Sequence, residues 1–143
     1  MTKSDILSKI QDFWFETRVD FFKSIIFVWH FWHLKILTGL ALLTNIINWF
    51  FARYISEEIG LEKIALHYNV DFGIDLYDNT NLVYTIPLLG TVILFFNFFL
   101  VLLISKYLKK DIKFISYILL VSALVANIIL IGATVSVYVI NFQ

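Results

Sequence analysis

The stretch Ile86–Ser105, IPLLGTVILFFNFFLVLLIS, decides the fold of this chain. It carries no charged side chain. It is also long enough to cross the hydrocarbon core of a bilayer, for which about 20 mostly apolar residues suffice in a helix. Pro87 lies at its start, where the missing N–H of proline does little harm to a helix. The stretch therefore predicts a transmembrane helix.

Two further apolar stretches lie on either side of it. Ile36–Ala52 is uncharged, and it extends to about Ile55 if the Arg53 side chain reaches out to the membrane surface. Phe114–Phe142 is uncharged and longer than a span requires, so this helix must tilt or protrude. We expect an all-α membrane protein with three transmembrane helices. The predicted membrane domain covers 36–143, with spans at about 36–55, 86–105 and 115–139 and an outer loop at 56–85.

The composition favours the same class of protein. Of the 143 residues, 60% are hydrophobic and the mean hydropathy is +0.84, which is typical of membrane proteins. Eleven basic residues balance eleven acidic ones, so charge does not indicate a nucleic-acid partner. The absence of cysteine excludes disulfides, thiolate nucleophiles and cysteine-bound metals. The polar start, MTKSDILSK, does not predict a removable signal peptide.

The distribution of lysine and arginine predicts the orientation, because basic residues concentrate in cytoplasmic loops. Two regions share one side of a three-span protein, the segment before the first span and the loop between the second and third. Their basic residues are Lys3, Lys9, Arg18, Lys23, Lys35, Lys106, Lys109, Lys110 and Lys113. The opposite side has Arg53 and Lys63. We therefore expect a bacterial inner or plasma membrane protein with a cytoplasmic N-terminus and an extracytoplasmic C-terminus.

Residues 1–35 predict an amphipathic helix on the cytoplasmic leaflet. Charged side chains recur every three or four residues and form one polar stripe: Asp5, Lys9, Asp12, Glu16, Asp20 and Lys23. The predicted anchors at the membrane surface are Trp14, Trp29 and Trp32. A rival interpretation makes Ser24–Asn45 a span, but Lys35 would then lie within it at a cost of about 2.5–3.5 kcal/mol near mid-bilayer.

The outer loop contains a stretch with period-two alternation, Ile64–Tyr77, IALHYNVDFGIDLY. Such alternation is typical of a half-buried strand. A strand needs a partner for its peptide groups, so we expect either a hairpin that turns at Gly73 or pairing with another chain. Neighbours on one strand face lie nearly 7 Å apart, from a rise of about 3.3 Å per residue, so one straight strand cannot surround a metal ion. The candidate partner-binding residues are His67, Tyr68, Asn69, Asp71 and Asp75.

The phrase ALHYNVDFGID, followed by the Pro-led span, resembles small bacterial three-span membrane proteins of unknown function. It is more distantly similar to the N-terminal domain of immunity proteins against a sporulation-delaying toxin. His67, Tyr68, Asn69 and Asp75 carry the match, which covers about residues 36–105. The sequence departs from the pattern at Ala65, where the family usually has proline, and at Gly73, which comes one position late. The resemblance implies that the ribbon recognises a ligand.

With the Arg53 side chain at the membrane surface, the hydrocarbon-spanning segments contain asparagine but no Asp, Glu, Lys, Arg or His, which disfavours proton or ion coupling. An amide in hydrocarbon needs a partner on a neighbouring helix, and small residues let helices approach closely. The candidate helix–helix contacts are Asn45, Asn97, Asn127, Ser122, Ala126 and Gly132.

The sequence lacks HExxH, GxSxG and a glycine-rich phosphate loop, so we expect neither an enzyme nor a cofactor or metal. We expect instead an accessory or structural subunit that contacts the lipid bilayer and binds a larger membrane complex or copies of itself. Abundant aromatic residues, which are favoured contact anchors, motivate this expectation. The alternative is a toxin-immunity or envelope-sensing protein that recognises a ligand through the His67–Asp75 ribbon.

Overall fold

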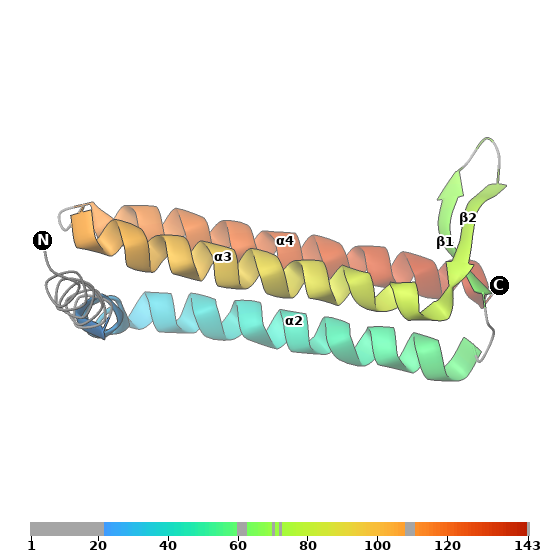
Figure 1. Cartoon of the computed structure of the whole chain (residues 1–143), viewed down its shortest axis with the longest axis horizontal. Coiled ribbons are helices and arrows are strands. Elements are labelled where there is room, and N and C mark those ends of the chain that lie inside the picture. The colour runs from blue at the N-terminus through green and yellow to red at the C-terminus, as the bar shows by residue number, and fades with distance from the viewer. Residues whose placement is uncertain (1–21, 60–62, 70, 72, 108–110, 143) are drawn as a thin grey trace, which may run out of the picture.

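Three long helices form one elongated bundle (Figure 1). A computed structural model describes residues 22–59, 63–69, 71, 73–107 and 111–142 of the chain. Within these ranges the long helices are α2 (Trp32–Ile59), α3 (Thr85–Tyr107) and α4 (Ile112–Asn141). Each runs opposite in direction to the one before, and α4 packs against both of the others.

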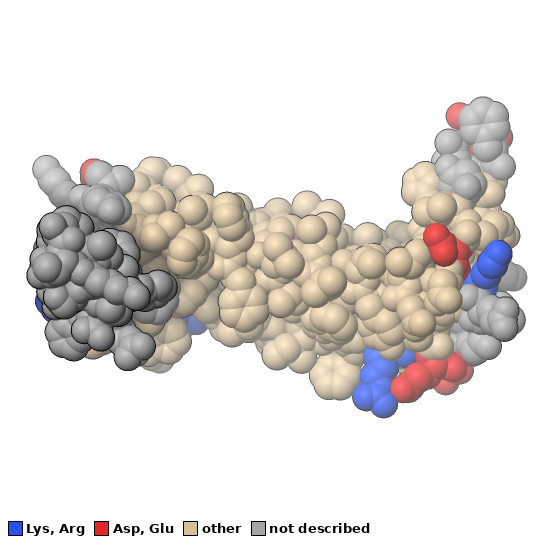
Figure 2. Space-filling view, viewed as in Figure 1, with Lys and Arg blue, Asp and Glu red and all other residues tan. Residues whose placement is uncertain are grey.

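All three helices are long and apolar enough to cross a membrane. Even α3, the shortest with 23 residues, is about 35 Å long at about 1.5 Å per residue, against a hydrocarbon thickness of about 30 Å. At most 28% of the most apolar window of each helix is buried inside the bundle, so most apolar side chains face outward. Figure 2 shows an uncharged band along the bundle, with charged side chains toward its two ends and more of them in view at the end that carries the hairpin. This surface is compatible with contact with a lipid bilayer.

The structure confirms three long apolar helices, and two of them extend beyond the predicted boundaries of 36–55 and 115–139. Hydropathy locates the apolar stretch, whereas the backbone stays helical into the charged ends. Near the end of α2, for example, Arg53 Nε donates to Glu57 Oε1 one turn later, at 2.8 Å. The stretch Ser24–Asn45 of the rival interpretation is not one continuous helix, because a helical segment at 22–29 ends in a turn at His30 and α2 begins anew at Trp32. Most of the predicted amphipathic helix over 1–35 lies outside the described residues.

The alternating stretch forms an antiparallel hairpin of β1 (Lys63–Asn69) and β2 (Gly73–Asn79) that projects from one end of the bundle (Figure 1). The hairpin alternative of the sequence prediction is thus the one observed. Gly73 has a φ of +76°, a backbone conformation that residues with a Cβ rarely adopt. β2 continues to Asn79, and the 3-10 helix η1 (Thr80–Tyr84) follows directly, with the Asn81 N–H donating to Asn79 Oδ1 at 2.9 Å.

Buried apolar residues form three clusters along the bundle. The cluster farthest from the hairpin joins α2, α3 and α4 to the segment at 22–29 through Val28, Leu34, Val101, Leu102 and Leu120. A middle cluster of small and branched residues contains Ala41, Leu94 and Ala123. The third cluster joins the hairpin and η1 to the bundle through Ala52, Ile55, Ile64, Val83 and Val137. The hairpin is therefore packed onto the helices at its base.

Candidate functional site

A network of polar side chains joins all three helices inside the bundle. Asn45 Nδ2 of α2 donates to Asn127 Oδ1 of α4 at 2.9 Å and to the Pro87 carbonyl of α3 at 3.0 Å. Asn127 Nδ2 donates to the carbonyls of Ala123, at 2.9 Å, and Gly90, at 3.4 Å. Asn127 is fully buried and Asn45 is 5% exposed. Both amide N–H groups of each asparagine are thus bonded without water.

Thr91 extends this network toward Trp49. The Thr91 hydroxyl lies 2.9 Å from both Asn45 Oδ1 and the Pro87 carbonyl, either of which can accept its single proton. It accepts a bond from the Trp49 indole N–H at 3.1 Å. Because these groups are neutral and mutually bonded, the network fixes how the helices face each other without burying a charge.

Gly90 lets α3 approach the two asparagines. A Cβ at this position would lie 2.4 Å from Asn127 Oδ1 and 2.7 Å from Asn45 Nδ2. Both distances are shorter than any ordinary contact, so any larger residue must displace the amides. At Gly132, by contrast, a Cβ would meet nothing within 4 Å.

A second polar contact lies closer to the hairpin. The Thr134 hydroxyl of α4 lies 2.6 Å from Asn48 Oδ1 of α2 and 3.1 Å from the Leu130 carbonyl. Asn48 and Thr134 are fully buried. The Asn48 amide nitrogen has no hydrogen-bond partner in the structure. This contact is therefore less well satisfied than the Asn45–Asn127 network.

The structure separates the candidate helix–helix residues into two groups. Asn45 and Asn127 bond each other directly, and Ala126 is half-buried. Asn97 Nδ2 instead donates to the Ile93 carbonyl of its own helix. Ser122 and Gly132 are exposed on α4, and the Ser122 hydroxyl bonds the Leu119 carbonyl of the same helix. Within the described residues the buried face of α4 carries Asn127 and Thr134, so a helix–helix contact through Ser122 and Gly132 stays a prediction.

The hairpin is held at its base by Asn141, in the last turn of α4. Asn141 Nδ2 donates to the Ala65 carbonyl at 2.8 Å, and the Ala65 N–H donates to Asn141 Oδ1 at 3.0 Å. Ile64 and Ala65 are each 1% exposed. A two-stranded hairpin is marginal on its own in water. The Asn141 bonds and the buried base therefore set its position on the bundle.

The candidate partner-binding residues lie on a hairpin whose two strands pair irregularly. The pairing register shifts twice, so that Leu66 and Asp75 are extra residues on opposite strands. A bulge bends the strand that carries it and increases the local twist. His67 and Asp71 are exposed. The side chains of Tyr68, Asn69 and Asp75 lie outside the described part of the structure.

The predicted membrane anchors are at the opposite end of the bundle. Trp29 is 51% exposed and Trp32 is 71% exposed, while Trp14 lies outside the described residues. His30 and His33 line two different cavities. Among the described residues, no group of three His, Cys, Asp or Glu side chains could hold a metal ion.

Several residues that build these sites were not singled out by the sequence reasoning: Trp49, Gly90, Thr91, Thr134 and Asn141. Polar residues and glycine within apolar stretches were the available signal, and it applies to each of them except Trp49. Comparisons of the chain with protein families, curated proteins and solved structures find no match. The resemblance to toxin-immunity domains therefore stays a prediction.

Proposed function

We propose that this chain is a non-enzymatic integral membrane protein that presents the β1–β2 hairpin to a partner subunit of a membrane complex. The bundle supplies the membrane anchor, and the Asn141 bonds to Ala65 hold the hairpin at a fixed position. In the proposed orientation the Lys-rich end faces the cytoplasm and the hairpin lies outside, as the distribution of basic residues favours.

The observation that carries this proposal is the free edge of β2 at Tyr77. In an antiparallel pair, each residue directs both its N–H and its C=O either toward the other strand or away from it. Ala65 directs both groups to Asn141 and hence away from β2. Its partner in the register is Tyr77, which must therefore direct its own peptide groups outward at the opposite edge.

The surroundings of this edge suit strand addition by another chain. Tyr77 is 59% exposed and its neighbour Leu76 is 48% exposed. No bond from the described residues reaches the outward peptide groups of Tyr77. An added strand would gain backbone hydrogen bonds there, and the tyrosine and leucine would provide side-chain contacts.

A pair of substitutions at position 77 tests the proposal. Tyr77→Pro removes the outward N–H while leaving the bonds between β1 and β2 in place, because proline is tolerated at strand edges. Tyr77→Phe keeps the N–H and most of the side chain. After mild detergent solubilisation from the native membrane, a stoichiometric partner should copurify with the wild type and Tyr77→Phe but not with Tyr77→Pro. Isolation of the wild type as a lone monomer would contradict the proposal.

The toxin-immunity or envelope-sensing alternative uses the same hairpin, but its recognition residues are His67 and Asp71 and not the backbone edge at Tyr77. It is favoured by the exposure of His67 and Asp71 beside the tip. His67→Ala should then abolish protection against the toxin, whereas Tyr77→Pro should not. Protection that survives His67→Ala would reject this alternative.

A further inference from the structure

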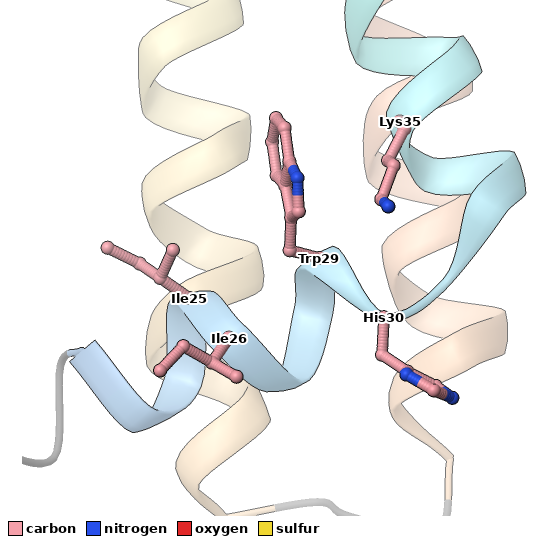
Figure 3. A pocket seen from close by; sticks show the side chains of 5 residues that line it. All are labelled: Ile25, Ile26, Trp29, His30 and Lys35. Atoms are coloured by element: carbon pink, nitrogen blue, oxygen red, sulfur yellow. The ribbon is translucent and has the colours of Figure 1, made fainter.

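A cavity of about 500 Å³ lies in the elbow between the helical segment at 22–29 and α2 (Figure 3). It is lined by Ile25, Ile26, Trp29, His30 and Lys35. Figure 3 shows the side chains of Trp29 and Lys35 facing each other across it. The isoleucines make one wall apolar, and Lys35 brings a positive charge to the other.

The charge of Lys35 has no acidic partner among the described residues. Its Nζ lies 5.9 Å from the ring centroids of both Trp29 and Trp32, which is within the range of cation–π attraction. The first turn of α2 contains no acidic residue. The ion pair found in the described part of the chain, Arg53–Glu57, lies near the other end of α2. A half-buried ammonium without a counter-ion among the described residues favours an anionic ligand.

The position of the cavity identifies the kind of anion. Lys35 is the last charged residue before the uncharged stretch Ile36–Ala52, so it lies where the hydrocarbon meets the headgroups if the bundle spans the membrane. Trp29 and Trp32 are side chains that favour the same depth. Basic pockets beside transmembrane helices recognise anionic headgroups.

We propose that this elbow binds one anionic phospholipid, with the phosphate at Lys35 and an acyl chain along Ile25 and Ile26. Ile26 is 71% exposed, and therefore offers apolar surface to such a chain. The neighbouring cavity also has a lysine, Lys113, but its lining includes the carboxylate of Asp111, which disfavours an anion there. This lipid site is separate from the hairpin and needs no protein partner.

Native mass spectrometry of the full chain in detergent tests the site. The chain is titrated with phosphatidylglycerol or with phosphatidylcholine of the same acyl chains. The wild type should bind one phosphatidylglycerol several-fold more tightly than phosphatidylcholine. Lys35→Gln should weaken phosphatidylglycerol binding about fivefold, the change expected for about 1 kcal/mol per basic residue near an anionic lipid. Lys35→Arg should retain the preference.

Lys23→Gln is the matched control, because Lys23 is exposed on the same helical segment and does not line the cavity. It removes the same net charge and should leave the preference intact. Equal losses in Lys23→Gln and Lys35→Gln would show attraction to general charge and overturn the site. Equal affinity of the wild type for both lipids would overturn it as well. Glycerol phosphate, the headgroup without acyl chains, should not compete at equal concentration, and full competition by it would contradict a lipid as the occupant.

Discussion

Replacing Gly90 by alanine tests whether the buried amide network holds the bundle together. The new Cβ would lie 2.4 Å from Asn127 Oδ1 and 2.7 Å from Asn45 Nδ2, so the direct bond between the amides must break or α3 must move away. An interhelical hydrogen bond in a membrane contributes about 0.6–2 kcal/mol. A buried polar group left unpaired costs about 1–3 kcal/mol. Together these predict that Gly90→Ala loses about 2–4 kcal/mol of unfolding free energy relative to a glycine substitution without the clash.

Gly132→Ala supplies that reference. Gly132 also lies within a helix, and its new Cβ would meet nothing within 4 Å. Alanine is favoured over glycine inside a helix by about 0.5–1 kcal/mol, and both variants gain this amount of stability. The difference between their unfolding free energies therefore isolates the effect of the clash. The assay is reversible unfolding in mixed micelles with increasing SDS, followed by circular dichroism and tryptophan fluorescence.

A third variant connects the loss to the network itself. In an Asn127→Ala background the nearest atom is gone and the Asn45 side chain can swing aside, so Gly90→Ala should then cost much less. Equal stability of Gly90→Ala and Gly132→Ala would refute the reasoning. An undiminished cost in the Asn127→Ala background would also refute it, because the loss would then come from another contact.

Two further predictions concern the hairpin base and the second polar contact. Asn141→Ala removes two bonds to Ala65 worth about 1 kcal/mol each, so hydrogen exchange of the amides in 63–79 should speed up about 30-fold, while the exposed Ser136→Ala should not change it. Unchanged exchange in Asn141→Ala would show that the buried base alone holds the hairpin. Thr134→Val leaves the whole Asn48 amide unpaired and should cost about 1–3 kcal/mol in the SDS titration. Asn48→Leu removes the orphaned amide nitrogen and should be neutral or stabilising; destabilisation beyond that of Thr134→Val would contradict this account.

Apolar length and the period-two pattern predicted the helices and the hairpin because both are local properties of the sequence. Ile86–Ser105 lies wholly within α3, and the alternation around His67 lies within the hairpin. The bulges at Leu66 and Asp75 were not predicted, since register depends on how the hairpin meets α4 and η1. Without the register, the outward edge at Tyr77 could not be located.

The partners inside the bundle depend on helix rotation, which a nearly uniform apolar sequence does not encode. Asn45 and Asn127 could be suspected because an amide in hydrocarbon needs a partner. Asn97 has the same chemistry but bonds its own helix through the Ile93 carbonyl. Small residues were equally ambiguous. Gly90 lies where α3 comes close to the amides of Asn45 and Asn127, whereas Gly132 is exposed. Only the packed structure separates these alternatives.

Cysteine labelling in intact cells tests the central claim that the bundle spans a membrane and presents the hairpin outside. The chain has no native cysteine, so single substitutions report one position each. Asp78 and Lys113 are both exposed and lie at opposite ends of the bundle. With a membrane-impermeant maleimide, Asp78→Cys should be labelled in intact cells and Lys113→Cys only after the membrane is opened. The reverse pattern, or labelling of both positions in intact cells, would contradict the account.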